Sequence, residues 1–187
     1  MQDFDTIKRR VMAKVGKMLA PEVTNEELTQ AINAAIDDAR NEMPYHIDPD
    51  ESVELEADTY EYSLAGLGFA YIHRITMADD DGEFPTTNVI CPHMYTVIAG
   101  PTLLFDCRTW APETGRALRI EGQAYQDNLV AGSDVLYISD AYIVNVAAGS
   151  LLGGLGSPRE ALMYRMAEDA RQRSPFLPIP SSHRVRS

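Results

Sequence analysis

Basic residues are scarce in this chain of 187 residues. Sixteen lysines and arginines stand against 28 aspartates and glutamates, which gives a formal net charge of −12 at pH 7. A protein that coats nucleic acid binds its phosphates and therefore needs a basic surface. The excess of acidic over basic residues thus argues against general nucleic-acid binding. Cysteine is scarcer still. Cys91 and Cys107 are too few for a disulfide framework and lack metal-type spacing, which predicts two free thiols in an intracellular protein.

Long hydrophobic runs are also missing. The longest apolar stretch, 141–155, is interrupted by Asn145, Ser150 and glycines, and it falls short of the roughly 20 residues that span a bilayer. The first ten residues, MQDFDTIKRR, are polar, which predicts no secretory signal. The hydrophobic fraction of 45% is ordinary for a globular protein. We therefore expect a soluble chain that folds as one domain, or as one domain with an insertion.

Motifs that carry chemistry are absent from the sequence. The acidic run 79–83 lacks the ligand alternation of an EF-hand and reads as a solvated hairpin tip, with a weak calcium site left open. The glycine-rich 153–156 precedes a helix but is not followed by Lys-Ser/Thr, so it does not form a phosphate loop. Neither a nucleophile elbow nor a zinc motif is found. We predict no enzymatic activity, no cofactor and no metal site.

The charges are unevenly placed along the chain. Residues 1–19 carry five bases and two acids, residues 171–187 carry four bases and no acid, and everything between holds 26 acids and seven bases. Basic ends on an acidic body favour association of one subunit's ends with its neighbour's body, although simple solvation of the ends is the alternative.

Apolar residues at helical spacing predict two helices near each end of the chain. The first covers 5–19 and stops before Pro21. The second starts at Thr24, where Glu27 completes a capping box, and stops at Pro44. Near the other end, Ser139 or Asp140 caps a helix over 141–155 that is apolar nearly all round. The run 157–160, Ser-Pro-Arg-Glu, is typical of a helix start with Ser157 as the N-cap, and this last helix extends to about Arg173.

Between the helices the apolar period switches to two, which indicates strands. Alternation places Phe69, Tyr71, His73, Ile75 and Met77 on one strand face, so His73 is expected to pack in the core. The predicted strands lie near 53–55, 59–64, 69–77, 93–99, 102–105 and 117–125.

These elements predict an α+β fold: a helical frame with an inserted small antiparallel β-sandwich or barrel and an extended C-terminal arm. The predicted bounds are 1–50 and 126–173 for the helical domain, 51–125 for the β domain and 174–187 for the arm. The arm has three prolines in six residues and apolar side chains between them, which suits docking in a partner groove or on an edge strand. The candidate interface residues are Lys8, Arg9, Arg10, Lys14, Lys17, Arg171, Arg173, Phe176, Leu177, Ile179, Arg184 and Arg186.

The arrangement of these segments resembles the head–tail connector (adaptor) proteins of tailed bacteriophages. The resemblance covers nearly the whole chain and is carried by its layout: two amphipathic N-terminal helices, a strand block with TYEYSL and FAYIHRITM, the strand RALRIEGQAYQ, and the paired helices of SDVLYISDAYIVNVAAGSLLGGLGSPREALMYRMAEDAR. The block of strands is larger than in the smallest adaptors of that family, so a stopper or another neck component remains an alternative.

The resemblance implies a structural virion protein of the neck, assembled in the host cytoplasm. It implies a homo-oligomeric ring, dodecameric in that family, which docks beneath the portal protein. The other side of the ring would bind stopper or tail proteins. Double-stranded DNA would pass through the ring without specific binding, and no membrane is involved. A different reading of the residues is a carbohydrate-binding β module, in which Trp110 and the tyrosines stack on sugars.

Overall fold

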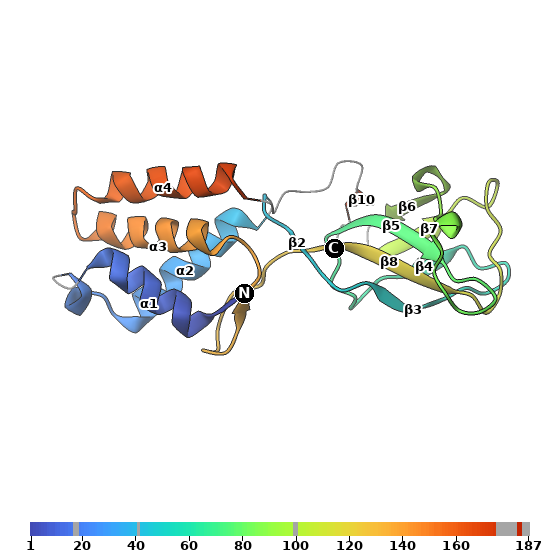
Figure 1. The fold of residues 1–187 in the computed structure, drawn as a ribbon, viewed down its shortest axis with the longest axis horizontal. Coiled ribbons are helices and arrows are strands. Elements are labelled where there is room, and N and C mark those ends of the chain that lie inside the picture. The colour runs from blue at the N-terminus through green and yellow to red at the C-terminus, as the bar shows by residue number, and fades with distance from the viewer. Residues whose placement is uncertain (17–18, 41, 99–100, 175–182, 185–187) are drawn as a thin grey trace. The chain divides into compact units, whose positions relative to one another are not determined.

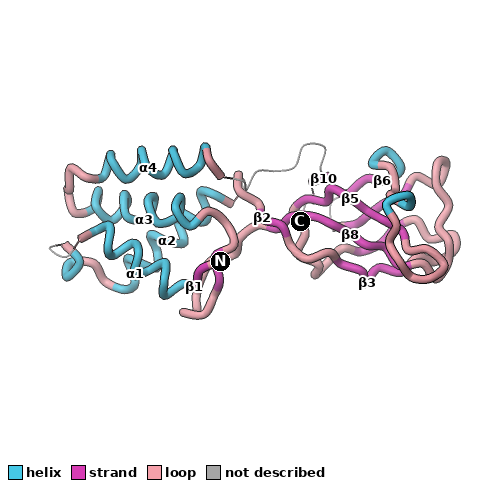
Figure 2. The backbone as a smooth tube through the Cα atoms, in the orientation of Figure 1, coloured by secondary structure: helices cyan, strands magenta, loops and turns pink. Residues whose placement is uncertain are grey.

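The computed structural model describes residues 1–187 except 17–18, 41, 99–100, 175–182 and 185–187, and for His183 and Arg184 it describes the backbone only. The described chain is mixed α+β, with four α-helices and antiparallel sheets (Figures 1 and 2). It divides into two compact units. The helical unit comprises Met1–Tyr45 and Tyr125–Leu177, and the β unit comprises His46–Ala124 and Pro178–Ser187.

In the helical unit, α3 lies between α4 on one side and α1 and α2 on the other (Figure 1). This position explains why α3 is apolar nearly all round: its neighbours cover most of its faces. A short antiparallel pair, β1 with β9, joins the two chain segments of the unit. The elements are β1 (Gln2–Asp3), α1 (Phe4–Val15), a 3-10 turn (Ala20–Glu22), α2 (Asn25–Ala39), β9 (Val135–Leu136), α3 (Asp140–Gly154) and α4 (Glu160–Gln172).

The helix boundaries follow local chemistry, with two corrections to the predicted ends. The capping box of Thr24 and Glu27 is confirmed, and Ser139 caps α3 by accepting a hydrogen bond from the Tyr142 N–H. However, α1 ends at Val15 and not at residue 19, because Gly16 adopts a positive φ of 94°. The predicted Ser157 cap of α4 is wrong, since the helix begins only at Glu160.

The β unit contains two antiparallel sheets that share one hydrophobic core. In the larger sheet the strand order is β10-β5-β8-β2, with β3 also paired to β8; in the smaller it is β4-β7-β6. Neither sheet closes into a barrel. The strands are β2 (Tyr45–His46), β3 (Asp50–Glu54), β4 (Glu61–Ser63), β5 (Tyr71–Met77), β6 (Tyr95–Ile98), β7 (Thr102–Phe105), β8 (Ala117–Ala124) and β10 (His183–Arg184), with 3-10 turns at Thr86–Asn88 and Pro92–Met94.

A register shift in β5 overturns the predicted strand face. The pairing of β5 with β8 is irregular between Ile72 and Arg74, which is the mark of a β-bulge. The bulge breaks the period of two, so Ile72 and Ile75 are both buried in the core. His73 is therefore displaced from the core face and lies half-buried at the edge of a charged cluster.

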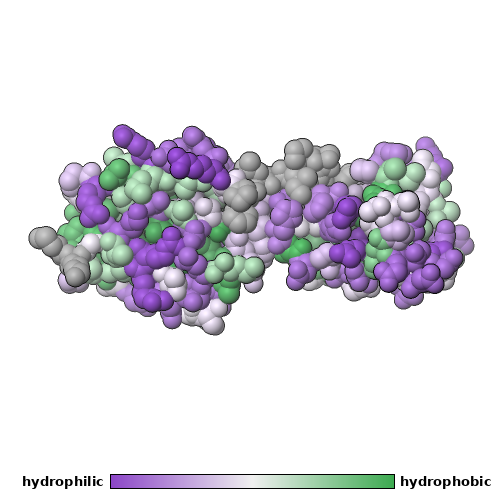
Figure 3. Space-filling model, in the orientation of Figure 1, coloured by the Kyte–Doolittle hydropathy of each residue, from purple (hydrophilic) through white to green (hydrophobic). Residues whose placement is uncertain are grey.

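The surface is largely polar. On the face drawn in Figure 3, hydrophilic residues spread over both units and are interrupted by small hydrophobic areas. None of the described helices combines the length and the apolar character that crossing a bilayer requires.

Candidate functional site

Two of the five basic residues predicted as a cluster in the first helix make an ion pair or a ring contact within the chain. Arg10 forms an ion pair with Asp140 at the start of α3 and a hydrogen bond of 2.6 Å to Gln2. Lys8 places its ammonium 4.1 Å from the centre of the Phe4 ring. Arg9 is exposed and bonds only within its own helix, to Thr6 and the Asp5 carbonyl. Arg9 and Lys14 thus remain as bases without an ion pair among the described residues.

Two further candidate interface residues, Arg171 and Arg173, lie near the end of α4 and differ in their contacts. Arg171 donates hydrogen bonds of 2.9 Å to both Glu168 and Glu42. The bonds from Arg171 and Gln172 lower the pKa of Glu168 to about 2. These contacts tie α4 to the end of α2, so Arg171 has a structural role. Arg173, by contrast, has no ion pair within the part of the chain that is described, and it lines a pocket.

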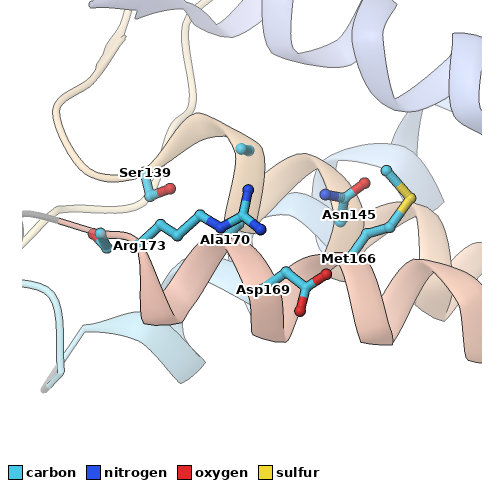
Figure 4. A pocket seen from close by; sticks show the side chains of 8 residues that line it. Ser139, Asn145, Met166, Asp169, Ala170 and Arg173 are labelled. Carbon is cyan, nitrogen blue, oxygen red and sulfur yellow. The ribbon is translucent and has the colours of Figure 1, made fainter.

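That pocket lies between α3 and α4 and has a volume of about 420 Å³ (Figure 4). Asn145 projects into it from α3, while Met166 and Asp169 come from α4 and Arg173 from the residue after α4. The wall is completed by Ser139, Ala141, Ala170 and Ser174. Its volume falls within the range of roughly 300–1,000 Å³ that is usual for ligand sites.

Asn145 is the unusual member of the pocket. Its side chain is only 6% exposed, yet its Oδ1 has no hydrogen-bond partner in the described structure. Leaving a buried acceptor unsatisfied costs about 1–3 kcal/mol, so such a group calls for an explanation. The sequence prediction did not include Asn145. The available signal was a single amide in a helix that is otherwise apolar nearly all round.

The main cluster of perturbed ionisable groups is on β5 and β8 of the β unit. Burial alone would raise the pKa of Glu121, but the hydrogen bond from Arg74 and the charges of Arg74 and Arg119 lower it overall. Burial lowers the pKa of His73, and the nearby Glu121 only partly offsets that effect. The Glu121 carboxylate is already shared among these cations. The Arg74–Glu121 ion pair of this cluster joins β5 to β8.

The depressed pKa of His73 makes the stability of the β unit depend on pH. A histidine that is kept neutral by the fold contributes stability above its unfolded pKa of about 6.5, and this is lost as the pH falls through the lower folded pKa. We expect the urea midpoint to fall between pH 7.5 and 5, and His73→Gln to flatten this slope. The exposed His93 provides the matched variant, His93→Gln, which should keep the full slope. An unchanged slope in His73→Gln would contradict the assignment.

A second pocket, of about 550 Å³, opens beside β6 and β7 of the β unit. It is lined by Tyr60, His93, Tyr95, Thr96, Leu104, Phe105, Asp106, Cys107 and Arg108. Trp110 is not part of this wall. Its ring stacks on Phe105 at a centroid distance of 4.1 Å and is partly buried there. The indole thus serves as a packing anchor, and no observation on Trp110 favours sugar stacking.

The acidic loop 79–83 uses its first carboxylate to hold its own backbone. Asp79 Oδ1 accepts hydrogen bonds from the N–H groups of Asp81 and Glu83, at 3.0 and 2.9 Å. Asp80 forms an ion pair with Arg116. Across the described residues, no group of three or more His, Cys, Asp or Glu side chains converges as a metal site would require.

Several predicted interface residues fall outside the described part of the chain: Lys17, Phe176, Leu177, Ile179 and Arg186. The backbone of Arg184 is described, and with His183 it pairs antiparallel to Tyr71 and Ile72 of β5. The described end of the predicted arm therefore adds a strand to a sheet of its own chain.

Comparison with known proteins does not extend these findings: the chain matches no family model, no curated protein and no solved structure.

Proposed function

We propose that the chain is a structural, non-enzymatic subunit of a head-to-tail connector, which forms a ring beneath the portal of a tailed virus and joins the capsid to the tail. The proposal rests on the resemblance in layout and on one structural observation: the helical unit carries exposed charges of opposite sign on two different helices. A ring of identical subunits needs two distinct, complementary surfaces on each subunit.

The two surfaces lie on α1 and α2. Arg9 and Lys14 on α1 have no ion pair to a described residue, and Arg9 is exposed. On α2, Glu26 and Asp37 are exposed and, being eleven residues apart, project from the same side of the helix. Asp37 also forms an exposed ion pair with Arg40 at 3.3 Å. Opposite charges on separate faces favour a head-to-tail contact and penalise the contact of like faces.

The β unit supports a role in which DNA slides without being held. Its segment 46–124 contains 14 acids and four bases, and its segment 178–187 adds Arg184 and Arg186. Three of those bases, Arg74, Arg116 and Arg119, are paired with carboxylates of the same unit. A surface of this kind offers few cations to phosphates, which suits the wall of a channel for passing DNA. The partners of the proposed ring are the portal protein on one side and stopper or tail proteins on the other, in the neck of the virion.

Charge reversal tests the subunit contact. We expect the double variant Arg9→Glu, Lys14→Glu to raise the dissociation constant between subunits by about tenfold or more, because it places acids opposite acids. Adding Glu26→Lys and Asp37→Lys to the same chain should recover much of the affinity. Sedimentation velocity at several salt concentrations, with and without portal protein, measures both effects.

The control is Arg165→Glu, which reverses an exposed base on α4 and should leave the α1–α2 contact unchanged. Assembly of the unmodified protein should weaken as salt screens the charges. A chain that stays monomeric with portal protein at every ionic strength would refute the proposed function.

A further inference from the structure

We propose that the pocket between α3 and α4 binds a small zwitterion, a free α-amino acid with an apolar side chain. Such a site goes beyond the proposed connector role and does not depend on it, because the pocket is formed within the helical unit of one chain. Three features of the pocket support this ligand: a buried amide without a partner, two opposite charges that are not paired with each other, and an apolar part of the wall.

Asn145 gives the pocket a buried hydrogen-bonding group. The side chain projects from α3 into the pocket and is only 6% exposed, and its Oδ1 has no hydrogen-bond partner in the described structure (Figure 4). An unsatisfied buried acceptor destabilises a fold. A ligand that donates a hydrogen bond to Oδ1 removes this cost, so the occupant must carry an N–H or O–H group.

Asp169 and Arg173 give the pocket two charges of opposite sign. Arg173 directly follows α4, about one helical turn beyond Asp169. Oppositely charged side chains at this spacing commonly pair, yet neither of these two forms an ion pair with any described residue, whereas the neighbouring Arg171 pairs with Glu168. A simple ion in the pocket would be attracted by one of the two charges and repelled by the other. A molecule that carries both charges is attracted by both.

The charged groups are placed so that one small molecule meets both. Figure 4 shows Ser139 and Arg173 toward one end of the pocket and Asn145 and Asp169 toward the other. The first end also has the N-terminal turn of α3, whose backbone N–H groups favour negative charge, so it suits a carboxylate. The second end combines the Asp169 carboxylate with the Oδ1 acceptor of Asn145. It suits an ammonium group, which has three N–H donors and no acceptor.

The remaining wall favours an apolar side chain on the ligand. Met166, Ala141 and Ala170 contribute apolar surface, and the volume of about 420 Å³ lies within the range usual for small-molecule sites. The flexible thioether of Met166 adapts to apolar groups of different shape. The pocket therefore suits a free amino acid such as leucine or methionine, in which the ammonium and carboxylate groups are attached to the same carbon atom.

Matched probes test the two charges by isothermal titration calorimetry of the full-length protein. Free L-leucine carries both charges, isoamylamine lacks the carboxylate, isocaproate lacks the ammonium group, and N-acetyl-L-leucinamide has neither. We expect L-leucine to bind with a millimolar or lower dissociation constant, and each of the other probes to bind at least about tenfold more weakly. An equal affinity for any of the other probes would overturn the zwitterion, as would no binding of L-leucine at millimolar concentration.

Substitutions locate the bound amino acid. In Arg173→Met, the preference for L-leucine over isoamylamine should largely disappear, whereas the preference over isocaproate should remain. In Asp169→Asn, the reverse is expected. Arg165→Met removes an exposed base of α4 that does not line the pocket, so it should leave both preferences unchanged. Preferences that stay the same in Arg173→Met and Asp169→Asn would place the leucine elsewhere and refute this site.

Asn145→Leu separates binding from folding. Leucine has as many side-chain heavy atoms as asparagine, with the same branching and no polar group. The thermal midpoint should therefore stay the same or rise, while the affinity for free L-leucine falls at least about tenfold. Asn33→Leu is the matched contrast, because the Asn33 carboxamide already bonds the Leu129 backbone at 2.9 and 3.0 Å, and its loss should lower the midpoint. A lowered midpoint in Asn145→Leu with unchanged affinity would show that the amide serves the fold and would overturn its role in the site.

The amino-acid site and the connector role fail separately. A chain that passes the leucine tests but stays monomeric with portal protein would refute the connector and leave the site in place. A ring-forming chain that fails the leucine tests would refute the site and leave the connector.

Discussion

Phe105→Ala is expected to lower the free energy of unfolding of the β unit by about 3–5 kcal/mol. Phe105 is 2% exposed and lies at the centre of an aromatic cluster. The Trp110 ring stacks on it, and the rings of Tyr62 and Tyr95 meet it edge-on at centroid distances of 5.9 and 6.2 Å. Truncation would remove the contacts of all three neighbours at once, and such rigid rings cannot collapse into the space left behind.

Urea unfolding followed by circular dichroism measures this loss, and the fluorescence of Trp110, the one tryptophan of the chain, reports on the same site. The matched variant is Phe84→Ala. Phe84 is only partly buried, so its loss should cost well under half as much. A cost for Phe105→Ala below about 1 kcal/mol would show that the cluster is not a tightly packed core.

Gly122→Ala should destabilise the same unit by about 3 kcal/mol, although it adds only one methyl group. A Cβ at Gly122 would lie 2.2 Å from the carbonyl oxygen of Tyr71 and 2.6 Å from the Phe69 ring. The Tyr71 carbonyl belongs to β5, which is held against β8 by the strand pairing, so it cannot move aside without breaking that pairing. The glycine thus permits the close approach of the two strands beside the bulge.

The control for this variant is Gly154→Ala at the end of α3. A Cβ there meets nothing within 4 Å, and the backbone is helical, so alanine should be neutral or stabilising by up to about 1 kcal/mol. Thermal and urea unfolding of both variants give the comparison. Equal stability of Gly122→Ala and the unmodified protein would mean that β5 and β8 separate more easily than their register implies.

The candidate site was only partly predictable. The charge pattern alone predicted the basic residues of α1 and of the end of α4 as interface candidates. It could not predict which of them form ion pairs within the chain. Arg10 pairs with Asp140 and Arg171 pairs with Glu42, partners that lie 130 and 129 residues away in the sequence. Of the described candidates, Arg9, Lys14 and Arg173 have neither an ion pair nor a ring contact with another described residue. The Asn145 pocket was missed because it forms where α3 and α4 meet, and neither helix has it alone.

The sequence by itself determined the elements whose causes are local. Apolar spacing located the four helices, and the Thr24–Glu27 capping box set the start of α2. Alternation located β3 to β8 but not the two-residue strands β1, β2, β9 and β10. The patterns that succeeded depend on residues within about one helical turn or one strand repeat of each other. The tertiary structure alone decided the bulge in β5, the place of His73, the pairing of Arg10 and the unsatisfied amide of Asn145. Each of these is set by a contact between segments far apart in the chain, and such contacts leave no periodic trace in either segment.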